Sequence, residues 1–237
     1  EQPTNEVIRL LMKLEYLLSK YKFHYSQTSI WNIKEAINTL FEFTELSSRN
    51  NIKLVLLKEI SLSKDLLVKL GRSGFIDENT YKKYNLILSE QENKIHQLKD
   101  NIFSKILENE FILSIKNKVY FPAGDNFFDL PSYLNFLTFN KNKIYASLDM
   151  WFENYPVIND TINAILELKR RSSSFEECVA VDGFYEVNYD KNLNLEIIRI
   201  KMDKDMNIYP IVSLNNRKIS ILFKMLASQD LIPKKIS

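Results

Sequence analysis

Apolar residues recur at steps of three and four along the first seventy residues of the chain. Between Glu6 and Tyr21 they fall at Val7, Leu10, Leu11, Leu14, Leu17, Leu18 and Tyr21, with polar residues between them. This is the period of an amphipathic helix with one buried face. The same spacing covers residues 30–44 and 52–70, and the latter run ends before Gly71-Arg72-Ser73-Gly74. The pattern therefore predicts three successive helices, the third of which stops at a glycine.

A fourth helix is predicted after Asp77, which stands three residues before Thr80 as an N-cap would. The apolar positions that follow form a near-heptad stripe at Tyr84, Leu88, Ile95, Leu98, Ile102 and Ile106. A stripe of this length indicates a helix of about 25 to 30 residues. Such a seam suits an antiparallel helix pair or a dimer face.

The pattern changes after Leu113, where residues 114–121 read as one strand or as two halves of a hairpin. In a strand, Lys116 and Lys118 would share one side while Ile115 and Val119 face the core. Pro122-Ala123-Gly124-Asp125 would then form the turn that ends it. Helical spacing returns in the segments 131–137, 146–151 and 158–171.

The last sixty residues are strand-like. Runs rich in β-branched and aromatic residues cover 178–181, 184–187, 195–202, 208–212 and 218–223, and turn-forming residues separate them. In this reading Cys178 is a buried strand residue. Helices followed by strands indicate an α+β protein with an antiparallel sheet. We expect an α-helical domain of residues 1–111 and 129–176, and a β-strand domain of residues 112–128 and 177–237.

Composition limits the class of protein. The chain has 237 residues, of which 45% are hydrophobic, so wholesale disorder is excluded. Lys and Arg number 32 against 30 Asp and Glu, a net charge of +2 that excludes a strongly basic nucleic-acid-binding chain. A single cysteine permits no internal disulfide, which fits a reducing cytoplasm. No apolar run approaches the length of a membrane span, and no signal peptide is visible.

Catalytic motifs are missing from the sequence. Four scattered glycines give neither a dinucleotide fingerprint nor a phosphate loop, and there is no serine elbow. The two histidines, His24 and His96, lie far apart in the sequence and predict no metal site. We therefore expect no enzyme activity, no metal and no cofactor.

The basic residues are the features most relevant to binding. Arg9 and Lys13 are one helical turn apart, and Arg49 and Lys53 repeat that spacing. From spacing alone, ordinary solvated helix surface explains these pairs better than a binding site does. Residues 211–237 hold five basic side chains and one acidic one: Arg217, Lys218, Lys224, Lys234 and Lys235 against Asp230. A local excess of this size suits a short acidic peptide more than a duplex.

Several segments together resemble a known family. They are Asn5-Glu6-Val7-Ile8-Arg9 through Lys13-Leu14-Glu15-Tyr16-Leu17, Leu56-Leu57-Lys58-Glu59, Phe128-Asp129-Leu130-Pro131 after Pro122-Ala123-Gly124, Gly183-Phe184-Tyr185-Glu186, and Tyr209-Pro210. Their order and spacing are similar to those of the ZapD family of cell-division proteins, over nearly the whole chain. The Phe128–Pro131 and Gly183–Tyr185 motifs are specific when they occur together.

The resemblance implies a cytoplasmic protein of the division site without catalytic activity. It would bind the C-terminal peptide of the tubulin-like GTPase FtsZ and cross-link FtsZ filaments into bundles, as a symmetric homodimer without nucleic acid or membrane insertion. Two sites per dimer would explain the bundling. By position, Arg9, Lys13, Arg49, Lys116 and Lys218 would carry the family's basic surface. Lysine in place of arginine loses bidentate geometry but keeps the attraction.

The chain departs from the family pattern where relatives place further basic residues, since it has Glu110, Leu134 and Leu222 there. Lys224 lies two residues after Leu222, on the same strand face, and is expected to replace that charge. Lys118 is expected to do the same for Glu110. An alternative is a nucleic-acid-binding module that uses Lys218, Lys224, Tyr209 and Phe223 as a stacking platform.

Overall fold

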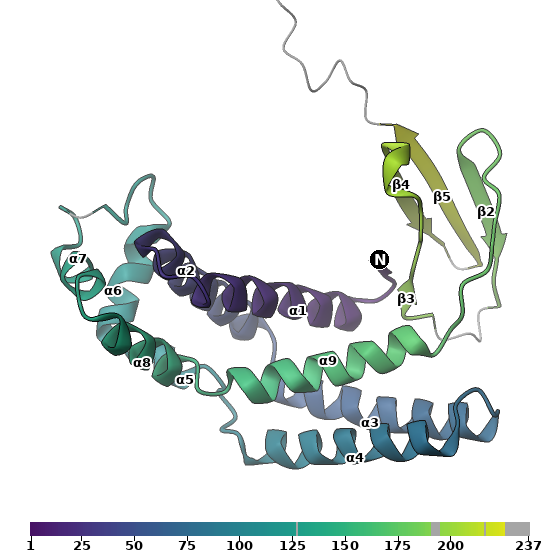
Figure 1. Ribbon diagram of the computed structural model, residues 1–237, viewed down its shortest axis with the longest axis horizontal. Coiled ribbons are helices and arrows are strands. Elements are labelled where there is room, and N and C mark those ends of the chain that lie inside the picture. The colour runs from purple at the N-terminus through teal and green to yellow at the C-terminus, as the bar shows by residue number, and fades with distance from the viewer. Residues whose placement is uncertain (127, 191–194, 216, 226–237) are drawn as a thin grey trace, which may run out of the picture. The chain divides into compact units, whose positions relative to one another are not determined.

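The computed structural model describes residues 1–126, 128–190, 195–215 and 217–225, and these form two compact units (Figure 1). The helical unit is Leu10–Ser172, and the sheet unit is made of Glu1–Arg9 and the residues from Ser173 onward. Helices followed by antiparallel strands give the α+β class that the sequence predicts. Each unit is described by itself below.

The first three helices confirm the apolar periodicity. They are α1 (Glu6–Tyr25), α2 (Ile30–Arg49) and α3 (Ile52–Arg72). Side chains of Ser29 and Asn51 accept hydrogen bonds from the first turns of α2 and α3, so both are N-caps. After α3, Phe75 N donates to Leu70 O and Gly74 N to Gly71 O, and Gly74 has φ +70°. This is a Schellman motif, so the predicted glycine stop is confirmed.

The long fourth helix is shorter than predicted. Asp77 caps α4 (Glu78–Gln97) by accepting a hydrogen bond from Thr80 N at 2.9 Å, as expected. The helix then ends, because Leu98 is extended and Lys53 Nζ donates to Leu98 O at 2.6 Å. A short α5 (Ser104–Leu107) follows. Tyr84, Leu88 and Ile95 are buried, and α4 packs against α3 and α9 (Tyr155–Arg171), as an intramolecular helix pair would.

The predicted strand at residues 114–121 is wrong, because this segment is α6 (Glu110–Val119), capped by Asn109. Ile112 and Ile115 are buried three residues apart, a helical spacing that the alternation of lysine and apolar residues concealed. Residues 112–128 consequently lie in the helical unit, not with the sheet. Gly124 packs so closely on the end of α6 that an added Cβ would lie 1.9 Å from Lys118 O.

The remaining helices are α7 (Pro131–Leu137), α8 (Lys141–Trp151) and α9, as the returning periodicity predicts. Proline occupies the first turn of both α7 and α9, where its missing N–H costs nothing. Aromatic rings fill the core between the helices. Phe152 contacts Phe43, Phe103 and Tyr21 with ring centroids 4.9 to 5.7 Å apart.

In the residues that the structure describes, the sheet unit holds two antiparallel sheets. In one, β1 (Gln2–Pro3) pairs with β3 (Ile197–Ile198); in the other the order is β2–β5–β4, with β2 (Phe184–Asn188), β4 (Ile208–Leu214) and β5 (Lys218–Met225). A 3₁₀ turn, η1 (Lys204–Met206), precedes β4. The prediction was correct for β2, β4 and β5. It was too long at 195–202, and residues 178–181 contribute only the isolated bridge Val181–Phe184.

Cys178 is also placed differently from the prediction. It is a free, exposed thiol outside the strands, not a buried strand residue. Its Sγ lies 3.2 Å from the hydroxyl of Tyr185.

Candidate functional site

One face of the three-stranded sheet collects the basic residues of β5. Strand alternation places Lys218, Ser220, Leu222 and Lys224 on the same side. Their partners across the sheet include Glu186 opposite Ser220, Phe184 and Ile211 opposite Leu222, and Tyr209 opposite Lys224. We call these eight residues the exposed sheet face. The register confirms that Lys224 shares a face with Leu222.

An apolar band crosses the middle of the exposed sheet face. Phe184, Leu222 and Ile211 are direct neighbours on three adjacent strands. They expose 45%, 40% and 43% of their surfaces, which is unusual for three large apolar side chains in register. Contiguous exposed apolar surface rimmed by polar residues is typical of an interaction site.

The two lysines of this face have different surroundings. Lys218 Nζ lies 2.7 Å from Glu186 Oε1, and Ser220 Oγ donates to Glu186 Oε2 at 3.2 Å. The hydrogen bond from Lys218, aided by the weaker effect of that from Ser220, outweighs desolvation and lowers the pKa of Glu186. Lys224 is exposed and takes part in no ion pair within the described ranges. One cation is therefore already paired, and the other is available.

A second group of candidate residues meets in the helical unit. Arg49 Nη2 at the end of α2 lies 3.2 Å from Glu45 Oε1, and Lys116 Nζ lies 4.0 Å from Glu45 Oε2. Lys116 also donates to Thr44 Oγ1 at 3.0 Å. The structure thus brings Arg49 and Lys116 together on one carboxylate. Lys116 does so from a helix, which corrects its predicted place on a strand face.

The helix α6 also separates Lys116 from Lys118. Two positions correspond to a rotation of about 200° around a helix axis. These side chains therefore do not share a face, as they would in a strand. Lys118 is exposed. It lies eight positions from Glu110, about 12 Å along the helix axis, and its compensation of that missing charge stays a prediction.

Arg9 and Lys13 both lie on α1, one turn apart as predicted. Arg9 Nε is 3.4 Å from Glu6 Oε1 on the same helix. Lys13 is exposed and has no ion pair to any residue that the structure describes. Lys234 and Lys235, the other basic residues noted near the C-terminus, fall outside the described residues.

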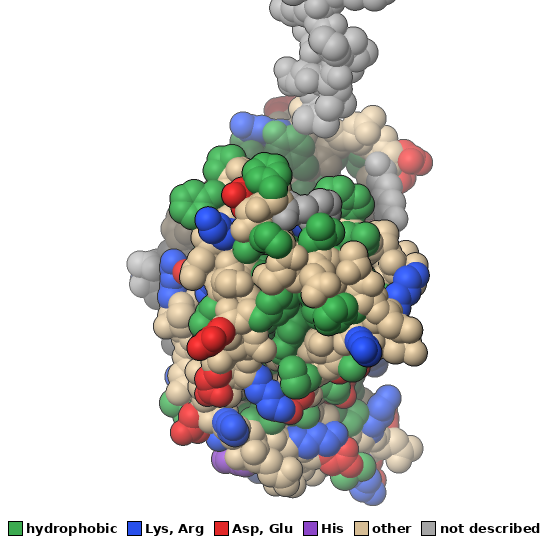
Figure 2. Space-filling view, turned by 90° about the vertical axis from the view of Figure 1, so that its left-hand side faces the viewer, with side chains coloured by type: hydrophobic (Ala, Val, Ile, Leu, Met, Phe, Trp, Pro, Cys, Tyr) green, Lys and Arg blue, Asp and Glu red, His purple; other side chains and the backbone are tan. Residues whose placement is uncertain are grey.

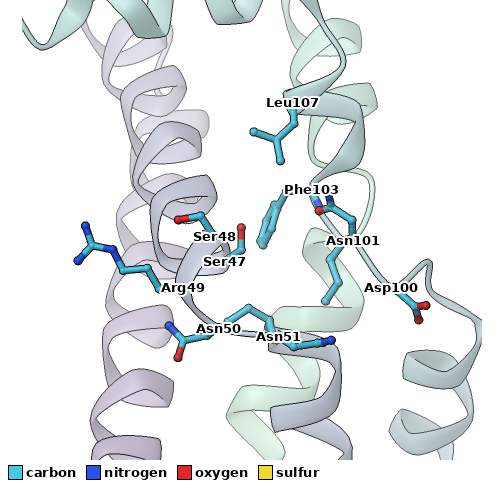
Figure 3. A pocket seen from close by; sticks show the side chains of 11 residues that line it. Ser47, Ser48, Arg49, Asn50, Asn51, Asp100, Asn101, Phe103 and Leu107 are labelled. Carbon is cyan, nitrogen blue, oxygen red and sulfur yellow. The ribbon is translucent and has the colours of Figure 1, made fainter.

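Arg49 stands at the rim of a polar pocket of about 360 Å³ (Figure 3). The α2–α3 turn, with Asn50 and Asn51, faces Asp100, Asn101 and Phe103 across it. The amide oxygens of Asn51 and Asn101 accept backbone hydrogen bonds from Leu54 and Phe103. These side chains stabilise the backbone of the two turns. We therefore interpret the pocket as the junction between these turns and not as a binding site.

Lys53 belongs to this junction as well. Its Nζ binds Leu98 O and, at 3.1 Å, Asp100 Oδ1. Arg49 and Lys53 therefore have different roles despite their regular spacing. Lys53 binds the end of α4, whereas Arg49 projects into solvent with 77% of its side chain exposed.

Sequence reasoning missed the acidic partners Glu45 and Glu186. The pair Glu45–Arg49 has the i,i+4 spacing that stabilises helices, so it was readable from the sequence. Glu186 reaches Lys218 from another strand, and only the register of β2 with β5 reveals that contact. Both carboxylates partly neutralise the expected basic surface.

Exposed apolar residues also gather at one end of the helical unit, which the sequence analysis did not pick out (Figure 2). Large apolar side chains are exposed in the segments that Figure 1 draws there: Trp31 in the first turn of α2, Phe121 and Phe128 between α6 and α7, and Leu134 in α7. Lys34 ties this region together, since its Nζ binds Asp125 Oδ2 at 2.5 Å and lies 5.0 Å from the centroid of the Trp31 ring. This anchors the segment before α7, which carries the Phe128–Pro131 motif.

Three further placements bear on function. Glu110 is the first residue of α6, where a carboxylate suits the helix dipole, and Leu134 and Leu222 are partly exposed. Tyr209 shares a face with Lys224, but Phe223 pairs with Pro210 on the opposite face. The stacking platform of the nucleic-acid alternative is therefore split between two sides of the sheet.

Within the described ranges, no cluster of three metal-binding side chains occurs and no helix could cross a membrane.

Comparison with known proteins defines a protein of cell division. The model of the family "ZapD: Cell division protein" matches residues 12–222. The chain belongs to the ZapD family. Two relatives are the proteins named "Cell division protein ZapD" from two strains of Coxiella burnetii, RSA 331 and RSA 493. Each is 25% identical over 223 residues, which cover 94% of this chain and 86% of the relative.

Proposed function

We propose that this protein binds the C-terminal peptide of FtsZ and, as a homodimer, cross-links FtsZ filaments into bundles at the division site in the cytoplasm. The proposal includes no reaction: the protein acts by binding alone. Its support is the membership of a cell-division family together with the exposed sheet face.

The exposed sheet face carries the argument. Its apolar band would take apolar side chains of an extended peptide, and Lys218 and Lys224 lie on either side of the band along β5, where they would attract carboxylates. Peptide recognition by a sheet commonly combines apolar pockets with charge at the rim. Arg9, which belongs to the same unit, would add a further cation.

The cations of the helical unit are proposed to serve the same acidic partner. Arg49 and Lys116 converge on Glu45, and Lys13 and Lys118 are exposed. A peptide carboxylate could take the position that Glu45 holds. Arg49 is the residue best suited to do this, because its guanidinium is mostly exposed and can bind both carboxylate oxygens.

Bundling follows from bivalency. A dimer offers two equivalent sites, and a filament offers many tails, so a second contact forms at high effective concentration once the first is made. Analytical ultracentrifugation tests this step directly. A protein that stays monomeric at concentrations where it bundles filaments would contradict the bivalent mechanism.

Co-sedimentation tests the partner. The protein should pellet with polymerised FtsZ and should remain in the supernatant when FtsZ lacks its C-terminal peptide. Equal pelleting with both polymers would refute recognition of the tail.

Neutralisation tests the site. Lys218→Gln combined with Lys224→Gln should weaken binding of the FtsZ tail peptide about three- to tenfold, since each rim charge contributes modestly. Lys82→Gln with Lys83→Gln is the matched control, because these exposed lysines of α4 lie far from the sheet in the sequence and belong to the other unit. Unchanged affinity in the first variant, with an unchanged thermal midpoint, would move the site away from the exposed sheet face.

A further inference from the structure

An aromatic pocket of about 290 Å³ lies in the helical unit, where the end of α1 meets the connection between α8 and α9. Its lining comes from Tyr21, Lys22 and Tyr25 on α1, and from Asp149, Phe152, Glu153, Tyr155 and Pro156. This volume is at the low end for ligand sites, so it suits one side chain rather than a cofactor. None of the basic residues discussed above lines it.

Four aromatic rings surround the pocket in contact with one another. The Tyr21 ring lies 5.7 Å from Tyr25, 5.1 Å from Phe152 and 5.5 Å from Tyr155, measured between centroids. Phe152 and Tyr155 are 5.3 Å apart and nearly perpendicular. Rings that meet at such angles present both edges and faces, and ring faces attract cations.

The carboxylate of Asp149 is placed beside these rings. Tyr25 OH donates to Asp149 Oδ1 at 2.7 Å, and Asp149 forms no ion pair among the described residues. Burial, and then this hydrogen bond, raise the pKa of Tyr25 to about 12, so the phenol keeps its proton and remains the donor. Donation to a carboxylate also makes the Tyr25 ring more electron-rich.

Two other charged residues belong to the lining. Glu153 pairs with Lys105. Lys22 forms no ion pair with a described residue, but it is exposed, and its flexible stem can hold the ammonium in water. Asp149 is the carboxylate of the lining that has no ionic partner among the described residues, and its hydrogen bond to Tyr25 places it beside the rings. Aromatic faces next to a carboxylate without an ionic partner can receive a cation.

We propose that this pocket binds the side chain of an arginine or lysine presented by a partner protein. The guanidinium or ammonium group would contact the ring faces and pair with Asp149. This inference does not rest on the proposed function, because that function uses cations of this chain and an acidic peptide, whereas here a carboxylate of this chain would receive a cation of the partner. The protein would then hold a basic residue and an acidic segment at separate places.

The experiment is a titration of the full ¹⁵N-labelled chain, followed by NMR, with N-acetyl-arginine amide and with N-acetyl-citrulline amide. Citrulline has nearly the shape of arginine but no charge. Arginine amide should cause saturable shifts confined to the amides of residues 21–25 and 149–156. It should bind about two- to thirtyfold more tightly than citrulline amide, the range expected for a cation at an aromatic face.

Variants then separate the carboxylate from the rings. Asp149→Asn should weaken arginine-amide binding about three- to tenfold. Asp65→Asn, the same change at an exposed position of α3 outside the pocket, should leave it unchanged. Equal affinity for arginine and citrulline amides, shifts scattered over the chain, or full affinity in Asp149→Asn would each overturn the proposal. The comparison of the two probes uses the unmodified chain and decides the question even if a variant fails to fold.

Discussion

The buried ion pair between α3 and α9 allows a quantitative test of how the helical unit is held together. Lys169 Nζ lies 3.1 Å from Glu59 Oε2, and the two side chains expose only 2% and 5% of their surfaces. Glu59 Oε2 accepts no hydrogen bond in the described residues, so its charge depends on the nearby ammonium group. Removing that group would leave a carboxylate in the core.

We predict that Lys169→Met lowers the free energy of unfolding by about 3 to 5 kcal/mol, the usual cost of breaking a buried pair from one side. This is a large part of the roughly 5 to 15 kcal/mol that stabilises a typical domain. For a chain of this length it corresponds to a fall in thermal midpoint of about 6 to 20 °C. Adding Glu59→Leu should recover most of the loss, because no uncompensated charge then remains in the core.

Urea denaturation followed by circular dichroism measures these differences. Lys82→Met is the matched control, since Lys82 pairs with Glu78 on the exposed face of α4 and its loss should cost less than about 0.5 kcal/mol. A loss below about 1 kcal/mol for Lys169→Met, or a double variant no more stable than the single one, would refute the argument that the pair is a desolvated electrostatic contact.

Three further predictions concern single positions. Gly74→Ala should lower the free energy of unfolding by about 1 kcal/mol, because Gly74 has φ +70° at the end of α3; thermal melts check it. Burial alone would raise the pKa of Glu35, but hydrogen bonds led by that from Lys20 lower it. Its contribution to stability is therefore present above the unfolded pKa and lost as the pH falls, so the stability difference between wild type and Lys20→Met should shrink below about pH 4.3. A constant difference across that range would contradict this assignment. If the proposed function holds, Glu186→Gln should raise affinity for the FtsZ tail about two- to fivefold in a peptide titration, because it removes the internal partner of Lys218; a weaker complex would contradict this.

The helices were predictable where a local sequence signal, an apolar stripe or an N-cap, determines them. In α1, α2 and α3 the apolar stripe is regular and continuous, and the N-cap at Asp77 carries its own signal. The length of α4 was not predictable in the same way. Its stripe continues through Leu98, but Lys53 binds the Leu98 carbonyl, and a contact over 45 positions has no local signature.

The error at α6 has a different cause. Alternating lysine and apolar residues fit a strand over six positions as well as they fit a helix, and short segments of this kind are ambiguous. The burial of Ile112 together with Ile115 decides for the helix. Since Lys116 and Lys118 were expected on one strand face, this local ambiguity carried over to the candidate site.

The sequence identified the basic candidate residues, but it did not show which of them are already paired with a carboxylate of the same chain. Strand parity alone placed Lys224 beside Leu222, and the register agrees. The pairing of Lys218 with Glu186 depends on which strands are neighbours in the sheet, and the meeting of Arg49 and Lys116 at Glu45 depends on the packing of α6 near α2. Such facts are properties of the tertiary structure.

The internal carboxylates have a consequence for how an acidic ligand would be held. Where Glu45 and Glu186 already occupy the cations, an incoming carboxylate substitutes for a resident one, and the displaced group returns to water. Such a swap conserves the number of ion pairs on the protein. Added salt then weakens the ion pairs of the complex and those of the free protein alike. The affinity for the ligand should therefore fall less steeply with salt than the number of lysines and arginines suggests. This arrangement favours rapid exchange of the bound acidic ligand over its permanent attachment.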